Sequence, residues 1–148
     1  MKYTGMMTAE DCTESDYDFL YKFIVIGEQK VGKTNIVTRF LNDKFENTTA
    51  TYAVEFAFKD YQRETGEKIR LQLWDTSGNE KHKMITFAHM RRTVGAFLVY
   101  DVSDQDSYFN LNYWLDNLRE YADEHVVIML IPNKCDVVLK DPAQREIK

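Results

Sequence analysis

The stretch that decides the fold is FIVIGEQKVGKTNIVTRF, residues Phe23 to Phe40. It opens as an apolar, strand-like run, Tyr21–Ile26, which stops at Gly27. After a short loop, the apolar residues between Lys33 and Leu41 recur at helical spacing. Two glycines five residues apart, followed at once by a lysine and a threonine, fit the pattern G-x-x-x-x-G-K-[ST] of a phosphate-binding loop.

Each fixed position of this loop has a physical reason. Gly27 and Gly32 let the backbone curl so that successive N–H groups point at an anion, and the helix that begins there adds its positive N-terminal end. Lys33 can place a charge between the terminal phosphates of a nucleotide, and the Thr34 hydroxyl can bind Mg²⁺. A chance match is the alternative, but the strand before the motif and the helix after it argue against that. Further contacts with the nucleotide are expected from Gln29, Lys30, Val31 and Asn35.

The tetrapeptide NKCD, Asn133 to Asp136, follows the last apolar run of the chain. Ligands of open α/β sheets bind at the carboxyl ends of the strands, which is where this segment is predicted to lie. There the Asp136 carboxylate can accept two hydrogen bonds from guanine, whose donors adenine lacks. Lys134 can lay its stem on the base, and Asn133 can tie this segment to the phosphate loop. Alone the string is commonly a polar loop, but beside a phosphate loop it indicates a guanine site.

The remaining pattern predicts the sheet. Ala53–Gln62 and Lys68–Asp75 alternate as strands, and the glycine between them favours an antiparallel hairpin. Ala96–Val102 and Val126–Lys134 are continuous apolar runs, typical of strands covered on both faces, and a helix is expected between Leu111 and Ala122. We therefore predict an α/β protein, with a mostly parallel twisted sheet, helices on both faces and one antiparallel edge hairpin.

Composition sets the general limits. The chain has 148 residues, a net charge of −5 and two cysteines far apart in sequence, Cys12 and Cys135. This length fits one domain, the acidic balance argues against a nucleic-acid partner, and the cysteines favour a reducing, cytoplasmic setting. Residues 1–18 lack a sustained period and predict a flexible acidic arm, with the folded domain over 19–148. No apolar run reaches transmembrane length.

A third segment, LWDTSGNE, lies between the two nucleotide motifs as residues Leu73 to Glu80. Asp75 ends a predicted strand and can hold Mg²⁺ through water, with a helix cap as the plainer alternative. The Gly78 amide can then contact a γ-phosphate.

In this order, GxxxxGK[ST], a threonine before a strand, WDTxG and NKxD resemble the Ras superfamily of small GTPases, and AVEF, RLQLWDTSGNE and RRTVGAFLVYDVS are most similar to its Rab branch. The resemblance covers about Phe19 to Val137. It implies a P-loop G domain that binds GTP and GDP with Mg²⁺ and acts as a nucleotide-controlled switch in vesicle trafficking. Effector, exchange-factor and activating proteins would bind through switch regions at about 45–56 and 75–92.

The resemblance also assigns two residues of the first switch region. Phe45 would sit edge-on against the guanine, and Thr51 would reach Mg²⁺ and the γ-phosphate. Because this region is one residue shorter than in the family, Thr48 and Thr49 stay open as alternatives to Thr51.

Departures from the family pattern bear on catalysis, for which Asn79, Lys33 and Thr51 are the expected residues. Asn79 replaces the glutamine that orients the attacking water, and its side chain is shorter by about 1.5 Å. Since phosphoryl transfer depends on positioning, slow hydrolysis is expected unless a small backbone shift restores the reach. Gln29 would crowd the space over the γ-phosphate, while Lys30 either supplies charge there or points into water.

Two alternative functions remain. One is a non-hydrolysing GTP-binding subunit of a larger assembly, in which Asn79 and Gln29 would have no catalytic role. The other, an ATP-using phosphate-loop kinase, is disfavoured by Asp136.

Residues 139–148 are too few for the last strand and long helix of the family, so we expect the natural polypeptide to continue, with any C-terminal lipid anchor for a membrane outside this sequence.

Overall fold

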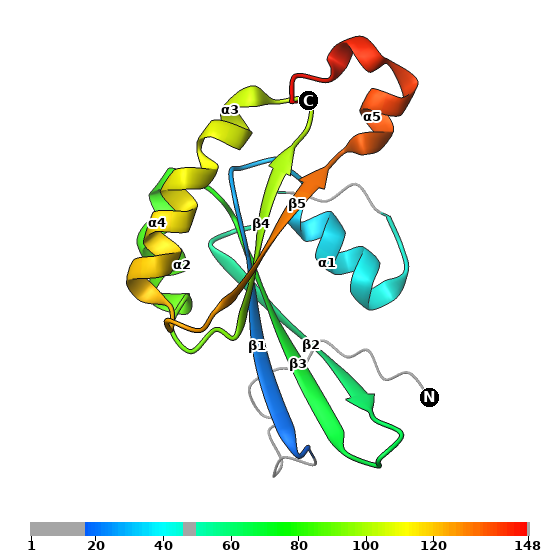
Figure 1. Cartoon of the computed structure of the whole chain (residues 1–148), viewed down its shortest axis with the longest axis vertical. Coiled ribbons are helices and arrows are strands. Elements are labelled where there is room, and N and C mark those ends of the chain that lie inside the picture. Colours follow the sequence, from blue (N-terminus) through cyan, green and yellow to red (C-terminus); the bar gives the residue numbers. More distant parts are fainter. Residues whose placement is uncertain (1–16, 46–49, 148) are drawn as a thin grey trace.

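The computed structural model describes residues 17–45 and 50–147. Its strands form one sheet of five, in the order β2-β3-β1-β4-β5 (Figure 1). The β2–β3 pair is antiparallel and the other neighbouring pairs are parallel, which confirms the predicted α/β class and the edge hairpin. The strand bounds are β1 Phe19–Ile26, β2 Val54–Gln62, β3 Lys68–Thr76, β4 Gly95–Asp101 and β5 Val127–Asn133.

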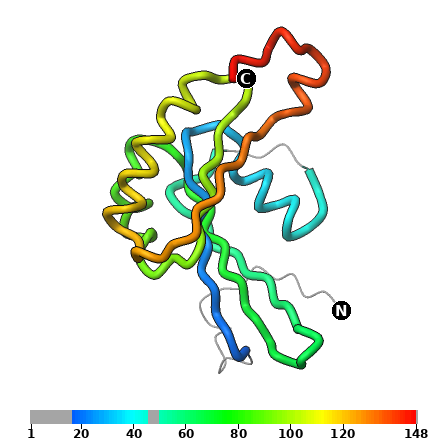
Figure 2. Tube along the Cα trace, viewed as in Figure 1, coloured from blue at the N-terminus to red at the C-terminus, as the bar shows by residue number. Residues whose placement is uncertain are grey.

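Helices lie on both faces of this sheet, and the trace in Figure 2 shows how the chain crosses between them. On one face is α1 (Lys33–Asn42); on the other are α2 (Lys83–His89), α3 (Gln105–Phe109) and α4 (Leu111–Tyr121). A one-turn 3₁₀ helix, η1 (Glu80–His82), precedes α2. After β5 come the short α5 (Cys135–Lys140) and η2 (Pro142–Gln144), neither of which the sequence pattern predicted.

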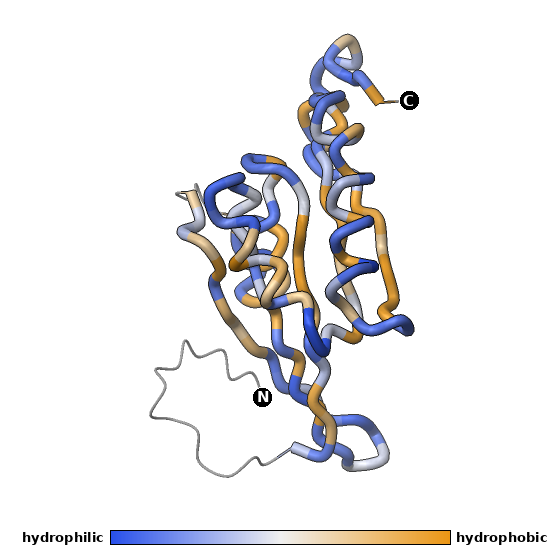
Figure 3. Tube along the Cα trace, turned by 90° about the vertical axis from the view of Figure 1, so that its left-hand side faces the viewer, coloured by the Kyte–Doolittle hydropathy of each residue, from blue (hydrophilic) through white to orange (hydrophobic). Residues whose placement is uncertain are grey.

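The sheet separates two hydrophobic cores, because successive strand residues point to opposite faces. Ile24 and Ile26 of β1 enter the core under α2 and α4, whereas Val25 between them enters the core under α1. Trp114 of α4 is fully buried in the larger core. Figure 3 shows the hydrophobic residues concentrated along the strands, while the helices alternate in hydropathy. Because β1, β4 and β5 are parallel neighbours, their carboxyl ends lie at the same end of the sheet.

β5 departs from the expectation of a strand covered on both faces. Val127 is 69% exposed, Met129 56% and Leu130 50%. Within residues 17–45 and 50–147, β5 lies at the sheet edge and pairs with β4 alone. The prediction was wrong because an apolar run marks a strand that needs cover without showing which element supplies it.

The chain is ordered slightly ahead of the predicted domain start. Asp18, assigned from sequence to the arm, donates its N–H to the Lys68 carbonyl at 2.8 Å, and its carboxylate accepts the Lys68 N–H at 2.7 Å. Residues 1–16 lie outside the described part, so the flexibility of the arm stays a prediction. None of the described helices is both long and apolar enough to cross a membrane.

Candidate nucleotide-binding site

The loop between β1 and α1 has the curled backbone that the glycine pattern predicted. Gly27 has a φ of 141° and Gly32 a φ of 95°, values that side-chain-bearing residues rarely adopt. A Cβ on Gly27 would lie 2.2 Å from the Val99 carbonyl oxygen, and one on Gly32 would lie 2.4 Å from Asn133 Nδ2. Gly27 therefore requires glycine for backbone conformation and for space, while at Gly32 the backbone conformation favours glycine and an added Cβ would also displace the Asn133 amide.

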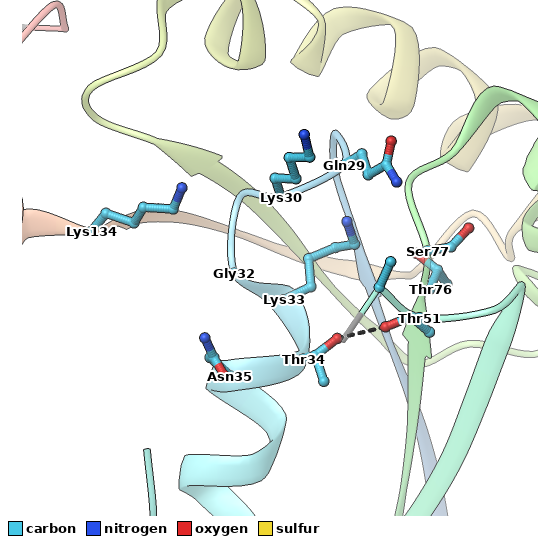
Figure 4. A pocket seen from close by; sticks show the side chains of 11 residues that line it. Gln29, Lys30, Gly32, Lys33, Thr34, Asn35, Thr51, Thr76, Ser77 and Lys134 are labelled. Atoms are coloured by element: carbon cyan, nitrogen blue, oxygen red, sulfur yellow. Dashed lines mark hydrogen bonds between the residues drawn. The ribbon is translucent and has the colours of Figure 1, made fainter. Parts of the chain in front are cut away.

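Lys33 lies beneath this curl, at the start of α1 (Figure 4). Its side chain is only 4% exposed, and its Nζ donates to the carbonyl oxygens of Gly27 at 3.0 Å and Glu28 at 2.6 Å. Burial lowers the pKa of Lys33 to about 8, although the negative charges of Asp75 and Glu28 act in the opposite sense. A phosphate group beside this ammonium would favour the charged form further.

Three oxygen-bearing side chains meet next to Lys33. The Thr34 hydroxyl lies 2.5 Å from Asp75 Oδ2 and 2.7 Å from the Thr51 hydroxyl, and the Thr51 hydroxyl lies 3.4 Å from Asp75 Oδ2. Figure 4 shows Thr34 and Thr51 facing one another from α1 and from the segment before β2. The structure thus brings Thr51 to this site, whereas Thr48 and Thr49 lie outside the described residues.

This oxygen cluster fits a Mg²⁺ ion. Asp75 is 3% exposed, and burial raises the pKa of its carboxyl group to about 6, against the opposing effects of the Thr34 hydrogen bond and the Lys33 charge. Its Oδ1 is buried without a hydrogen-bond partner among the described residues, so it can accept from a metal-bound water. Hydroxyl and carboxylate oxygens are ligands that Mg²⁺ prefers, and Thr34 and Thr51 can bind it directly.

Two neighbouring cavities surround the loop. One, of about 400 Å³, is lined by Lys33 and other phosphate-loop residues and by the Mg²⁺ candidates Thr34 and Thr51. The second, of about 570 Å³, brings Asp136 and Phe45 together, although they are 91 residues apart in sequence (136 − 45). The two cavities share Gly32, Asn35 and Lys134, so they adjoin. The first is lined by Gln29, Lys30, Gly32, Lys33, Thr34, Asn35, Ala50, Thr51, Thr76, Ser77 and Lys134.

Hydrogen bonds hold the segment after β5 in place. Asn133 Nδ2 donates to the Val31 carbonyl at 2.7 Å, which is the link between this segment and the phosphate loop that the sequence predicted. Lys134 has a left-handed backbone, with φ 61°, and its Nζ lies 2.6 Å from Asp101 Oδ2. Burial alone would raise the pKa of Asp101, but the hydrogen bonds from Lys134 and Ser103 outweigh it and hold that pKa below its usual value.

The segment after β3 packs directly against the phosphate loop. Gly78 has a φ of 66°, and a Cβ there would lie 2.4 Å from the Gly27 carbonyl oxygen and 2.6 Å from Lys33 Nζ. The next residue, Asn79, uses its Oδ1 to accept the Lys81 N–H at 2.9 Å, so its side chain caps η1. The carboxamide oxygen is therefore already engaged at the position where a water-orienting group was expected.

Other contacts join the two switch regions, and the sequence analysis did not single them out. Ala53, with a left-handed φ of 61°, accepts the Ser77 N–H at 2.9 Å. The Tyr52 ring, 82% exposed, lies 5.0 Å edge-on from the His82 ring, whose Nδ1 is 3.2 Å from the Ser77 hydroxyl.

The fold and the site together define a phosphate-loop nucleotide-binding domain, since the glycine loop joins the first strand to a helix and NKCD closes the same edge of the sheet. The family model described as "Ras family" matches residues 22–148. The chain belongs to the Ras family of small GTPases.

Curated proteins of this family are similar to most of the chain. The "GTP-binding protein ypt3" of Schizosaccharomyces pombe is 43% identical over 128 residues, which are 86% of this chain and 59% of that protein. The "Ras-related protein Rab-11A" of Dictyostelium discoideum is 44% identical over 126 residues, 84% of this chain and 58% of that protein. The "Ras-related protein rab-11.1" of Caenorhabditis elegans is 42% identical over 125 residues, 84% and 59% respectively. The chain therefore spans less than two thirds of these relatives' lengths.

Proposed function

We propose that the chain is a Rab-type small GTPase that binds GTP and GDP with Mg²⁺ and acts as a nucleotide-controlled switch in vesicle trafficking. The observation that carries this proposal is the adjoining pair of cavities, in which Lys33 faces one and Asp136 the other. One ligand with a polyphosphate at one end and a base at the other can occupy both. The similarity to a GTP-binding protein and two Rab-11 proteins supports guanine as that base.

Each end of the nucleotide would meet a matching chemistry. The loop N–H groups and the Lys33 ammonium stabilise phosphate charge, and Thr34 and Thr51 hold the Mg²⁺, which supplies further charge neutralisation when bound. Asp136 accepts the two guanine donors, and Phe45, which is 75% exposed, can cover the base from the side. The Asn133–Val31 hydrogen bond keeps the two ends of the site in register.

We further propose that hydrolysis of GTP is slow. Phosphoryl transfer depends on holding a water in line with the γ-phosphate, and Asn79 is both shorter than the expected glutamine and bound to Lys81 through its oxygen. Gln29, exposed at the mouth of the phosphate cavity, narrows the approach for a partner's arginine. Lys30 is also exposed there, at φ 67°, where its ammonium can reach either the cavity or water.

The capping hydrogen bond of Asn79 also favours a second function, that of a GTP-binding subunit which uses the nucleotide as a structural ligand in a larger assembly. The two functions predict different turnover. A switch converts its GTP to GDP over minutes to hours and then changes partners, whereas a structural subunit keeps GTP intact. Identifying the bound nucleotide after prolonged incubation with Mg²⁺ distinguishes them.

Partner proteins would recognise the two switch regions, about 45–56 and 75–92. Both carry exposed apolar side chains: Tyr52 is 82% exposed and Met84 is 73% exposed. Such groups are typical of protein interaction sites. We place the protein in the cytoplasm, with peripheral membrane attachment if the natural chain carries a C-terminal lipid anchor.

Substitution of Asp136 tests the guanine assignment. Asp136→Asn removes the carboxylate charge and replaces one of its two acceptor oxygens with an N–H donor, so GDP affinity is expected to fall by about two to four orders of magnitude. The same variant should gain affinity for xanthosine diphosphate, whose 2-oxo group accepts from the new amide. Titration with fluorescent nucleotides measures both, with Asp123→Asn, an exposed carboxylate outside both cavities, as the matched control. Unchanged GDP affinity in Asp136→Asn would contradict the proposal.

A further inference from the structure

A hydrogen bond joins the phosphate loop to α4 across 86 residues of sequence. Trp114 Nε1 donates to Glu28 Oε1 at 2.9 Å. Trp114 is completely buried, and Glu28, half-buried, is the residue that follows Gly27 in the phosphate loop. Because the acceptor is a carboxylate and the donor lies in the core, this bond is of the strong, charge-assisted kind.

Glu28 connects this bond to the phosphate-binding machinery. Its backbone carbonyl accepts from Lys33 Nζ at 2.6 Å, while its side chain is held by Trp114. The residues that follow, Gln29 and Lys30, are exposed. Glu28 thus links the phosphate loop to α4 through a hydrogen bond.

Trp114 is well suited to hold the loop because aromatic neighbours fix its ring. Phe87 of α2 packs edge-on against it with a ring distance of 6.4 Å, and Tyr113 does so at 5.7 Å. Lys83, at the start of α2, places its ammonium 4.2 Å from the Tyr113 ring and 5.9 Å from the Trp114 ring. The indole therefore lies between the phosphate loop and the helix of the second switch region.

We propose that Trp114 is a positioning residue for nucleotide binding: its indole N–H holds the Glu28 carboxylate, which keeps the loop carbonyls and Lys33 in the phosphate-binding arrangement and slows nucleotide release. The inference rests on the proposed function, because it requires a nucleotide in the loop. Trp114 itself touches no ligand and acts through Glu28.

The direction of the change in nucleotide release separates this proposal from a simple charge effect. A carboxylate close to bound phosphates repels them, so removing its charge alone should slow release of the nucleotide. Removing the hydrogen bond that fixes the loop should speed release. The plainer role, in which Glu28 only satisfies a buried indole N–H, predicts a loss of stability without a change in release.

Dissociation of fluorescent N-methylanthraniloyl-GDP, chased with excess GDP in Mg²⁺, tests the proposal. Glu28→Ala removes charge and hydrogen bond together and is expected to release the nucleotide about three- to tenfold faster. Glu28→Gln keeps an acceptor for the indole without the charge, so its release should be no faster than that of the wild type. Trp114→Phe removes the donor while keeping an aromatic ring and the Glu28 charge, so it should release the nucleotide at least as fast as Glu28→Ala. Tyr113→Phe is the matched control on the same helix, with wild-type release expected.

The double variant Glu28→Ala/Trp114→Phe separates a specific link from general destabilisation. If Trp114 acts through Glu28, the double variant releases no faster than Glu28→Ala, whereas independent effects multiply. Thermal unfolding of the nucleotide-loaded variants is recorded alongside. Because Glu28→Ala leaves the side chains of the hydrophobic core in place, it keeps the test valid if Trp114→Phe unfolds. Wild-type or slower release in Glu28→Ala, or multiplied effects in the double variant, would overturn the proposal. A wild-type chain that binds no GDP analogue would refute the proposed function, and this inference with it.

Discussion

Substitutions at Asn79 separate capping from catalysis. In the structure, its carboxamide oxygen accepts the Lys81 N–H at 2.9 Å and caps η1. Loss of such a cap costs about 1 kcal/mol. A glutamine at the same position would reach about 1.5 Å further toward an attacking water. Since one cap bond is worth much less than correct placement of the nucleophile in phosphoryl transfer, the longer side chain should gain activity.

The expected order of hydrolysis rates follows from this comparison. Asn79→Gln should hydrolyse GTP at least about tenfold faster than wild type, a barrier change of about 1.4 kcal/mol. Asn79→Ala, which lacks the cap and the carboxamide, should stay within about twofold of wild type, because the wild-type oxygen is already bound to Lys81. The two variants are matched, since both lose the asparagine cap.

Single-turnover hydrolysis of radiolabelled GTP, with enzyme in excess and Mg²⁺ saturating, measures these rates without product release. GDP affinity of each variant, measured in parallel, controls for damage to the binding site. An alanine variant slower by about tenfold or more would show that Asn79 already orients the water. That result, or a glutamine variant no faster than wild type, would refute the reasoning.

Three further predictions concern the loops and the ion pair around the site. Asn133→Ala removes the hydrogen bond to Val31, and release of a fluorescent GDP analogue should accelerate about three- to tenfold; unchanged release would show that the link is dispensable. Gly78→Ala forces a Cβ against the phosphate-loop backbone and should lower the melting temperature clearly more than Gly66→Ala. Both glycines have a positive φ, 66° and 94° respectively, but no atom lies within 4 Å of the carbon added at Gly66, so equal losses would contradict the packing argument. Asp101 has a lowered pKa in the fold, so its ion pair with Lys134 stabilises the protein fully above the ordinary carboxyl pKa, and this stabilisation is lost as pH falls through the lowered value. Asp101→Asn should therefore weaken the fall of the melting temperature at acidic pH. An unchanged fall would argue against this account.

The parts of the fold that follow from local pattern were predictable. Alternation in β2 and β3 and the glycine between them specify a hairpin, and the glycine loop specifies the β1–α1 junction. The Asn133–Val31 hydrogen bond was also predictable, because both residues were assigned to the same edge of one sheet.

Contacts that depend on three-dimensional packing were not predictable from one sequence. Trp114 lies in the helix expected between Leu111 and Ala122 and packs in the core, but nothing in the helical spacing shows that its N–H meets Glu28. The cap made by Asn79 had a signal, since asparagine is favoured at N-caps, but the family resemblance implies a catalytic role at the same position. The exposure of β5 depends on neighbouring elements that the apolar run does not reveal.

The left-handed backbone at Ala53 has an energetic consequence for switching. A residue with a Cβ pays roughly 1 kcal/mol to adopt this conformation, whereas glycine adopts it at little cost. Ala53 sits directly after Thr51 and Tyr52 and accepts the Ser77 N–H, so the ordered arrangement of this segment carries that conformational energy. A factor of about five in population corresponds to 1 kcal/mol. The chain thus has a bias of about this size against the ordered arrangement of the segment before β2, and in the proposed switch the contacts with a bound γ-phosphate would have to offset it.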